Sequence, residues 1–394
     1  MKLMRTQVGI VGAGPAGMML AHLLHHAGID SVVVELRSRQ YVQERVRAGV
    51  LEQGTHDLMI ETGVGARLQR EGITHHGLEL RFGGKPHRID LSALTGGKSI
   101  TIYPQGELVK DLTDARIATG APIFFDAKDV CTHDPESDVP TIRFLVDGQE
   151  HQIRCGFIAG CDGFHGITRT SIPSSALAIF ERTYPFAWLG ILAETPPSSE
   201  ELIYCHHERG FALHSMRSPR LTRLYLQCDP DEDIANWPDD RIWSELNTRF
   251  STDDGWKLNR GPIVQRGITP MRSFVAEPMR YGRLLLAGDC AHIVPPTGAK
   301  GLNLAIADVR LMAGALAEFY QTGSHDLLDR YSQTSLRRTW KVQRFSWWMT
   351  SMLHRFPNEN PFDQRRQIAE LDYVTSSRAA AQSLAENYVG LPFD

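Results

Sequence analysis

Several features that mark other classes of protein are absent from this sequence. Its six cysteines form no CxxC pair and match no zinc-ligand spacing, and there is no internal repeat, low-complexity tract or long flexible linker. The 42 lysines and arginines are outnumbered by 46 aspartates and glutamates, a net charge of −4, whereas a nucleic-acid binder usually carries a basic domain. The 394 residues, 42% of them hydrophobic, exclude general disorder, a collagen-like fibre and a disulfide miniprotein. They predict a soluble cytoplasmic protein with reduced thiols and no metal site.

Acidic and basic residues are missing from one stretch near the N-terminus, residues 6–29. A run of that length is compatible with a signal peptide or a membrane span. However, it contains Gly12, Gly14, Gly17 and Gly28 together with three histidines. Its pattern is a short β-branched run, a glycine turn and a helix, so we favour a soluble element over the membrane alternative.

The same stretch predicts a β-α-β unit that binds a dinucleotide. A strand at residues 7–11 leads into a GxGxxG turn, a helix follows, and Glu35 closes the next strand 18 residues after Gly17. In this context Gly12 allows the tight turn, Gly14 lets a pyrophosphate approach the backbone, and Gly17 lets helix and strand pack closely. The helix N-terminus favours the phosphates. Glu35 suits ribose hydroxyls and would repel a 2′-phosphate, which indicates an NAD- or FAD-like nucleotide; a turn without a ligand is the alternative.

Two later segments favour FAD over NAD. Residues 160–169 contain Asp162 followed by glycine. The second segment, residues 283–303, begins within a predicted buried strand over residues 282–289 that delivers Asp289 at its end. A carboxylate at that position can accept hydrogen bonds from a ribityl chain.

The segment after Asp289 suits a flat ring. Gly298 and Gly301 let the backbone approach such a ring before the next helix. The N–H groups of that helix, which starts near Leu302 and Asn303, can stabilise negative charge on a reduced flavin.

The order of these three motifs resembles the FAD-dependent aromatic hydroxylases, the class A flavoprotein monooxygenases. The resemblance implies a mixed α/β (α+β) fold: a Rossmann-like FAD-binding domain with an inserted β-sheet substrate domain and a helical C-terminal region. The expected boundaries are 1–180 for the FAD-binding domain and 181–270 for the substrate-binding sheet. Residues 271–394 complete the FAD site and form the helical interface region.

Within this family the resemblance covers essentially the whole chain and is strongest to members that act on 4-hydroxybenzoate. Residues 47–54, 295–303, 344–350 and 385–392 carry it. It implies conversion of 4-hydroxybenzoate to 3,4-dihydroxybenzoate through a flavin C4a-hydroperoxide, with FAD bound, dioxygen and NADPH (or NADH) as co-substrates, and a homodimer. The alternatives are hydroxylation of another phenolic or amino benzoate, an NAD-dependent dehydrogenase, and a non-catalytic flavin-binding protein.

The resemblance also assigns roles around the substrate. Ser215, Arg217 and Tyr225 match the residues that hold the carboxylate, a role that suits a bidentate guanidinium and two hydroxyl donors. Tyr204 matches the tyrosine that bonds the phenolic oxygen, and Tyr388 the next tyrosine in a proton relay.

Three further positions complete that predicted active site. His75 matches the histidine that links the relay to solvent, although its neighbour His76 has an equal claim by composition. The carbonyl of Pro296 matches an acceptor for the substrate hydroxyl, and Arg223 matches an arginine that favours the anionic reduced flavin.

There is no second GxGxxG, so the resemblance implies a surface groove for the nicotinamide cofactor. Matching positions there are Arg37, Tyr41, Arg45, Arg47, His165 and Arg272, while Arg45, Arg47 and Gln105 also line FAD. Leu36 departs from the family pattern. Arg37 and Arg39 can still meet a 2′-phosphate, which favours NADPH without excluding NADH.

A basic and aromatic stretch at residues 337–348 needs a separate interpretation. Its composition is compatible with nucleic-acid or membrane-surface binding. We favour a helix with an apolar packed face and outward-facing basic residues, placed at a subunit interface.

Overall fold

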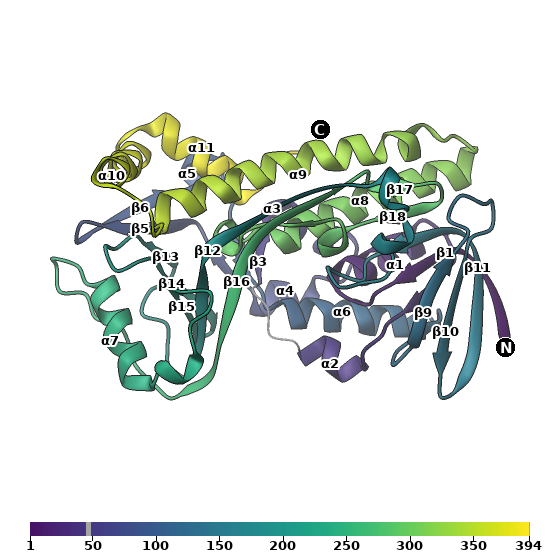
Figure 1. Ribbon diagram of the computed structural model, residues 1–394, viewed down its shortest axis with the longest axis horizontal. Helices are drawn as coiled ribbons and strands as arrows, with labels where there is room; N and C mark the ends of the chain where they lie inside the picture. Colours follow the sequence, from purple (N-terminus) through teal and green to yellow (C-terminus); the bar gives the residue numbers. More distant parts are fainter. Residues whose placement is uncertain (45–48, 394) are drawn as a thin grey trace.

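The structure, a computed structural model, describes residues 1–44 and 49–393. Two eight-stranded sheets and a three-stranded sheet organise the described residues, with helices packed around them (Figure 1). The first large sheet runs in the order β17, β18, β11, β1, β2, β8, and β10 and β9 extend it from β11. Its strands are β1 Lys2–Val11, β2 Ser31–Val34, β8 Ile123–Phe124, β9 Lys128–His133, β10 Thr141–Val146, β11 Gln149–Gly160, β17 Arg280–Tyr281 and β18 Leu284–Leu286.

Parallel strands form the centre of this sheet. β1 pairs in parallel with both β2 and β11, and β11 pairs in parallel with β18. β2 consists of Ser31 and three valines, all buried, as expected for a strand covered on both faces. Val11, Gly160 and Leu286 are in register, so the loops after three strands meet at one edge, where the predicted nucleotide motifs lie.

Several helices pack together beside that sheet. α1 (Pro15–His26) packs against α8 (Gly301–Thr322) and α6 (Gln105–Ala118). The remaining helices of this half are α2 (Arg39–Glu44), α3 (Gln53–Glu61) and α4 (Ala66–Glu71). The predicted strand over residues 282–289 is shorter than expected: β18 is followed by a 3-10 turn at Gly288–Cys290. Gly288 has φ +66°, a left-handed conformation that ends the strand and that glycine adopts without strain.

The second large sheet runs in the order β19, β16, β12, β15, β14, β13, β5, β6. Its strands are β5 Gly77–Phe82, β6 Lys85–Asp90, β12 Ala178–Ala193, β13 Leu202–Cys205, β14 Ala212–Ser218, β15 Leu221–Cys228, β16 Ile263–Glu277 and β19 His292–Ile293. α7 (Asp239–Phe250) buries Ile242, Trp243, Leu246 and Phe250 in a core shared with this sheet. The long strands β12 and β16 run from this sheet toward the first one (Figure 1).

The three-stranded sheet joins β3 (Val50–Glu52), β7 (Ile100–Ile102) and β4 (Ile73–His75), all of which fall between β2 and β8 of the first sheet in sequence. α5 (Leu91–Leu94), α10 (Pro361–Ser376) and α11 (Arg378–Val389) lie near β5 and β6. The mixed α/β fold predicted from the sequence is confirmed, whereas the three domain boundaries stay a prediction.

α9 (Asp326–Leu353) is the longest helix among the described residues and runs along one side of the molecule (Figure 1). It contains the basic and aromatic stretch, and Phe345 and Met349 on its buried face join the core of the second sheet. Trp340 and Trp347 remain 42% and 44% exposed. The prediction of a helix with one packed face is therefore correct. In the described part of the chain, no helix is long and apolar enough to cross a membrane.

Candidate active site

The glycine turn after β1 has the shape that a pyrophosphate requires. Gly12 has φ +106°, and a Cβ there would lie 2.3 Å from the carbonyl oxygen of Cys161. A Cβ on Gly17 would lie 1.9 Å from the carbonyl oxygen of Gly12, so helix and strand are packed as closely as backbones allow. A Cβ on Gly14 would meet nothing within 4 Å. The turn is therefore closed on the protein side and open at Gly14, where a ligand can approach.

The N-terminus of α1 and the end of β2 complete this cradle. No side chain caps α1, and its first turn holds no acidic residue, so its free N–H groups and positive dipole end are available to an anion. Glu35 accepts hydrogen bonds from the backbone N–H of Ala13 at 2.7 Å and of Arg37 at 2.8 Å. These bonds fix the carboxylate beside the turn. The residues present fit a dinucleotide.

The two aspartates of the later motifs, Asp162 and Asp289, differ in their hydrogen bonds. Asp162 accepts hydrogen bonds from the N–H and the hydroxyl of Thr168, at 2.9 and 2.6 Å, and so holds its own loop. Asp289 is exposed between the buried Gly288 and Cys290, and no side-chain hydrogen bond joins it to the described residues. Its carboxylate is the one that remains available for a ligand hydroxyl.

The start of α8 is tied to β3. Asn303 accepts a hydrogen bond from the N–H of Glu52 at 2.9 Å and donates to the carbonyl oxygens of Val50 at 2.8 Å and Ala299 at 3.1 Å. Its side chain thus fixes the backbone on both sides of the predicted ring site. Gly301 is open, with nothing within 4 Å of an added Cβ, whereas one on Gly298 would press on Phe345 at 3.1 Å.

For the other predicted cofactor residues, the structure gives only their burial and their place in the chain. Leu302 and Gln105 are half-buried, and Gln105 begins α6. Arg45 and Arg47 lie outside the described residues.

Strands β14 and β15 bring the predicted carboxylate clamp together, with Ser215 opposite Arg223 and Leu213 opposite Tyr225. Arg217 donates to the hydroxyl of Ser215 at 3.1 Å and to the carbonyl oxygen of Met216 at 3.0 Å. Its Nε is buried without a partner among the described residues, as are Nε and Nη1 of Arg223. Two neighbouring guanidinium groups with buried, unused donor atoms indicate a site for an anion.

The electrostatics of the clamp agree with that interpretation. Burial lowers the pKa of Arg217 below its ordinary value. Burial favours a higher pKa for the Tyr225 hydroxyl, but the positive charges of Arg217 and Arg223 outweigh it, so the pKa of Tyr225 lies below its ordinary value. The Arg223 guanidinium lies 5.1 Å from the centre of the Tyr225 ring. The site is therefore electropositive, and an incoming carboxylate would neutralise it.

The two predicted relay tyrosines are in contact. The hydroxyls of Tyr204 on β13 and Tyr388 on α11 are 2.5 Å apart, and both side chains are 1% exposed. Burial raises the pKa of each hydroxyl above its ordinary value. Both tyrosines are therefore neutral near pH 7 and can pass a proton along the bond that joins them.

His75 makes no hydrogen bond to Tyr204 or Tyr388 among the described residues. Both of its ring nitrogens are buried without a hydrogen-bond partner among the described residues, and burial lowers its pKa to about 4. His76 points elsewhere, with Nδ1 3.0 Å from the Ser92 hydroxyl. The carbonyl of Pro296 accepts the N–H of Ala299 at 2.9 Å, which leaves one lone pair for a further donor.

The predicted nicotinamide residues form two separate groups. Arg37 lies over the ring of Tyr41 at 5.3 Å, while the nearby Arg39 is bonded to Asp114 at 2.7 Å. His165 and Arg272 flank Phe164, at 5.0 Å between ring centres and 4.8 Å from guanidinium to ring.

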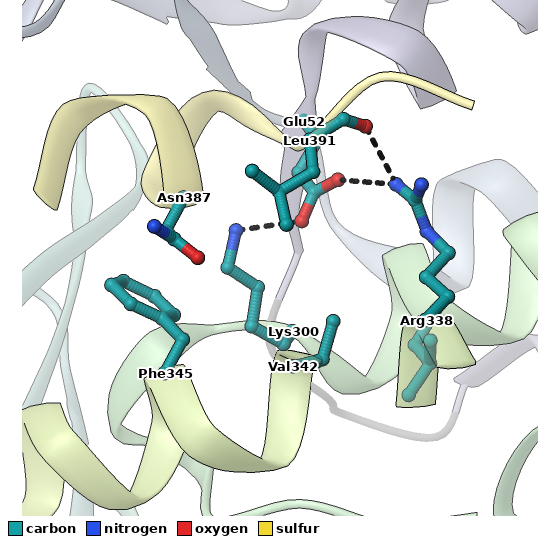
Figure 2. A pocket seen from close by; sticks show the side chains of 8 residues that line it. Glu52, Lys300, Arg338, Val342, Phe345, Asn387 and Leu391 are labelled. Atoms are coloured by element: carbon teal, nitrogen blue, oxygen red, sulfur yellow. Dashed lines mark hydrogen bonds and ion pairs between the residues drawn. The ribbon is translucent and has the colours of Figure 1, made fainter. Parts of the chain in front are cut away.

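Sequence reasoning missed a buried ion pair beside the relay (Figure 2). The Lys300 ammonium lies 2.6 Å from the Glu52 carboxylate and donates to the carbonyl oxygen of Tyr388 at 3.0 Å. Arg338 lies 3.9 Å from the other oxygen of Glu52. Glu52 on β3, Lys300 at the N-cap of α8 and Arg338 on α9 lie far apart in sequence, and no spacing pattern in a single sequence reveals such a pairing.

Comparisons with known proteins agree with this site. Residues 5–346 match the model of a family described as "FAD binding domain". The chain belongs to this family and is an FAD-dependent enzyme of the class A flavoprotein monooxygenases. More particularly, it is similar to the p-hydroxybenzoate hydroxylase of Acinetobacter baylyi (strain ATCC 33305 / BD413 / ADP1), with 50% identity over 394 residues, 100% of this chain and 97% of the relative.

More distant proteins share the fold. An uncharacterized aromatic compound monooxygenase of Bacillus subtilis (strain 168) is 26% identical over 84% of this chain and 65% of the relative. The crystal structure of p-nitrophenol 4-monooxygenase from Pseudomonas putida DLL-E4 superposes with a TM-score of 0.82 at 20% identity, covering 100% of both chains. The family, enzyme class and FAD cofactor predicted from the sequence are confirmed; the roles of individual site residues stay predictions.

Proposed function

We propose that this protein hydroxylates 4-hydroxybenzoate at carbon 3. The reaction consumes 4-hydroxybenzoate, dioxygen, NAD(P)H and one proton, and it yields 3,4-dihydroxybenzoate, water and NAD(P)⁺. The observation that carries the proposal is the neighbouring pair of the buried Arg217 and the half-buried Arg223. Nε of Arg217 and both Nε and Nη1 of Arg223 are buried donors without a hydrogen-bond partner among the described residues. The similarity to p-hydroxybenzoate hydroxylase supports the same substrate.

The clamp selects an aromatic acid. Arg217 offers a charge-assisted hydrogen bond to a carboxylate, and the hydroxyls of Ser215 and Tyr225 add two donors. Binding an anion there supplies a counter-charge to the buried Arg217 and the half-buried Arg223, whereas a neutral phenol leaves both cations uncompensated. The clamp therefore favours a benzoate over a phenol.

The relay prepares the other end of the substrate. A hydrogen bond from Tyr204 to the phenolic oxygen favours the phenolate, because a donor stabilises the charged form. The phenolic proton passes to the Tyr204 oxygen as the Tyr204 proton crosses the 2.5 Å contact to the Tyr388 oxygen, and Tyr388, which stays neutral, releases its own proton toward solvent. The negative charge enriches the ortho carbon in electrons, which makes it the site of attack. FAD, when bound by the glycine turn, Glu35 and Asp289, supplies hydride acceptance and oxygen activation.

The remaining substrates and the assembly follow from the resemblance. NADPH is the preferred reductant in this proposal, because Arg37 carries no ion pair among the described residues and is free to meet a 2′-phosphate, although Asp114 already engages Arg39. NADH remains the competing reductant. The proposal includes dioxygen as oxidant and a homodimer in solution.

The test measures oxidation of NADPH by the FAD-loaded protein, with 4-hydroxybenzoate, with benzoate and with phenol, and identifies the product. We expect strong stimulation by 4-hydroxybenzoate alone and one 3,4-dihydroxybenzoate for each NADPH consumed. Benzoate lacks the hydroxyl and phenol lacks the carboxylate, so each isolates one half of the site.

Other results would contradict parts of the proposal. Stimulation with mainly hydrogen peroxide would make 4-hydroxybenzoate an effector and another phenolic or amino benzoate the substrate. A kcat/KM that favours NADH would refute the preference for NADPH.

A further inference from the structure

An arginine of α9 contacts the segment after α11, residues 390–393 (Figure 2). Arg338 donates to the carbonyl oxygens of Leu391 and Pro392, both at 2.9 Å. Its side chain is 13% exposed and also lies 3.9 Å from the Glu52 carboxylate. Three groups thus share one guanidinium, whose planar fork suits several acceptors at once.

Phe393 anchors the far end of this segment. The guanidinium groups of Arg310 on α8 and Arg338 on α9 each lie 4.4 Å from the centre of its ring. The ring also faces α3, since a Cβ added to Gly54 would lie 3.5 Å from it. The ring face attracts both cations, so these contacts fix residue 393 to three helices.

The segment is continuous with the relay tyrosine. Tyr388 is the penultimate residue of α11, and its carbonyl oxygen accepts a hydrogen bond from Lys300 at 3.0 Å. Gly390 follows with φ +102°, and a Cβ there would lie 2.4 Å from a Glu52 oxygen. The chain therefore turns tightly over Glu52 before it reaches Arg338, and little slack separates Tyr388 from the anchor.

From these contacts we infer that Arg338 and the 390–393 segment are positioning elements that hold the hydroxyl of Tyr388 against that of Tyr204. The inference rests on the proposed function, in which these two hydroxyls carry the phenolic proton. The last carbonyls of a helix have no partner within it, and the end of α11 is secured by Lys300 and by the anchored segment instead. If these contacts were removed, the last turn of α11 would fray, as helix ends do when their tertiary contacts are lost.

Fraying at that point has a specific consequence for the chemistry. Tyr388 touches the substrate only through Tyr204, and a displacement of about 1 Å is enough to impair a proton-transfer geometry. Without its acceptor, Tyr204 would stabilise the phenolate less, so the pKa of bound 4-hydroxybenzoate would rise and coupling would fall. The carboxylate clamp on β14 and β15 is not attached to this segment and would still bind the substrate.

The test compares Arg338→Met and Phe393→Ala with two matched controls in the full-length FAD-loaded enzyme. Arg344→Met removes an exposed arginine of the same helix, and Phe362→Ala removes a 74% exposed phenylalanine; neither residue is bonded to the segment. The pH titration of bound 4-hydroxybenzoate, followed by phenolate absorbance, is measured for each protein. The ratio of product to NADPH consumed and the KM for 4-hydroxybenzoate complete the set.

For both segment variants we expect the phenolate titration to move up by about one pH unit, a tenfold change in ionisation. We expect product per NADPH to fall several-fold and the KM to change by less than about threefold. Arg338→Lys, which keeps the charge and an ammonium donor group but loses the planar fork, should recover part of both losses. The two controls should match the wild type.

A merely structural role would lower the melting temperature of the segment variants and leave the phenolate titration and coupling at wild-type values, which would overturn the inference. Failure of the proposed function looks different: wild-type protein would itself give no phenolate signal and no stimulated NADPH oxidation. In that case the role of the segment in this relay is refuted together with the relay.

Discussion

At the scale of single residues, the structure distinguishes side chains that composition leaves equivalent. His75 and His76 are adjacent in sequence, yet His75 is fully buried with both nitrogens unused, whereas His76 contacts Ser92 at the surface. The unused nitrogens identify His75 as the one with capacity for a new partner. A step from Tyr388 to His75 requires an intervening donor or a movement, because no hydrogen bond links the two in the described residues.

Tyr204 gives the sharpest prediction at this scale. Its hydroxyl contacts Tyr388 at 2.5 Å in a fully buried setting, while the carboxylate clamp lies on other strands. Tyr204→Phe should therefore weaken 4-hydroxybenzoate binding by only about 1 kcal/mol, but lower the product formed per NADPH by roughly tenfold or more. The measurement is hydrogen peroxide and product per NADPH. Tight coupling in this variant would refute the proton relay, and Tyr184→Phe, a tyrosine bonded to Ser273, serves as control.

At the scale of elements, the glycine turn between β1 and α1 contains some glycines that the packing of the chain requires and one that a ligand requires. The sequence predicted three roles for its glycines, and the backbone distances agree with that division: Gly12 and Gly17 face protein backbone, whereas Gly14 faces open space. The same turn can therefore be altered in a way that disturbs only the ligand.

Gly14→Ala should fold normally and bind FAD poorly. Gly14 has φ −70°, which alanine adopts readily, so we expect the apoprotein to keep or gain up to about 1 kcal/mol of stability. The added methyl group occupies the space that the pyrophosphate needs, and the Kd for FAD should rise at least about tenfold. Thermal unfolding of the apoprotein and a flavin-fluorescence titration measure the two effects.

Two other glycine variants serve as comparisons for Gly14→Ala. Gly314→Ala lies within α8 with nothing near an added Cβ, so it should add about 1 kcal/mol of stability and leave FAD binding unchanged. Gly17→Ala places its methyl 1.9 Å from the Gly12 carbonyl and should prevent folding of the unit. Equal FAD affinities in Gly14→Ala and Gly314→Ala would contradict the assignment of the turn.

At the scale of the whole molecule, the sequence predicted what short-range patterns encode. The β-α-β unit, the buried strand that leads to Asp289 and the helix that starts near Leu302 all follow from periodicity and glycine placement. The structure contains each of them, the strand in a shortened form. The Glu52–Lys300 pair and the Arg338 contacts with residues 391 and 392 were not predictable, because they join elements that meet only after two sheets have assembled. The roles of Ser215, Arg217 and Tyr204 came from resemblance rather than from any local pattern.

The buried histidines make the stability of the whole molecule depend on pH. Burial lowers the pKa of His75 and His206 to about 4 and of His214 and His354 to about 3, against an ordinary value of 6.5. His354 is fixed as neutral by its contacts, since Nε2 lies 2.7 Å from the indole nitrogen of Trp188 and Nδ1 lies 3.0 Å from the Thr350 carbonyl. The folded state therefore excludes protons that the unfolded chain takes up.

The sign of the effect follows directly. As pH falls from about 6.5 toward 4, each of these four histidines gains a proton in the unfolded chain and not in the folded one, so the free energy of unfolding falls by up to about 1.4 kcal/mol per histidine per pH unit. We expect the denaturant midpoint to drop steeply across this window, and His214→Gln to remove about a quarter of the slope.

His292 acts in the opposite sense: burial lowers its pKa, but the Asp308 carboxylate at 2.5 Å outweighs burial and raises it, so its contribution is lost as pH rises above that raised value. Stability should therefore peak near neutrality, and a midpoint that stays constant between pH 6.5 and 5 would contradict the burial of neutral histidines.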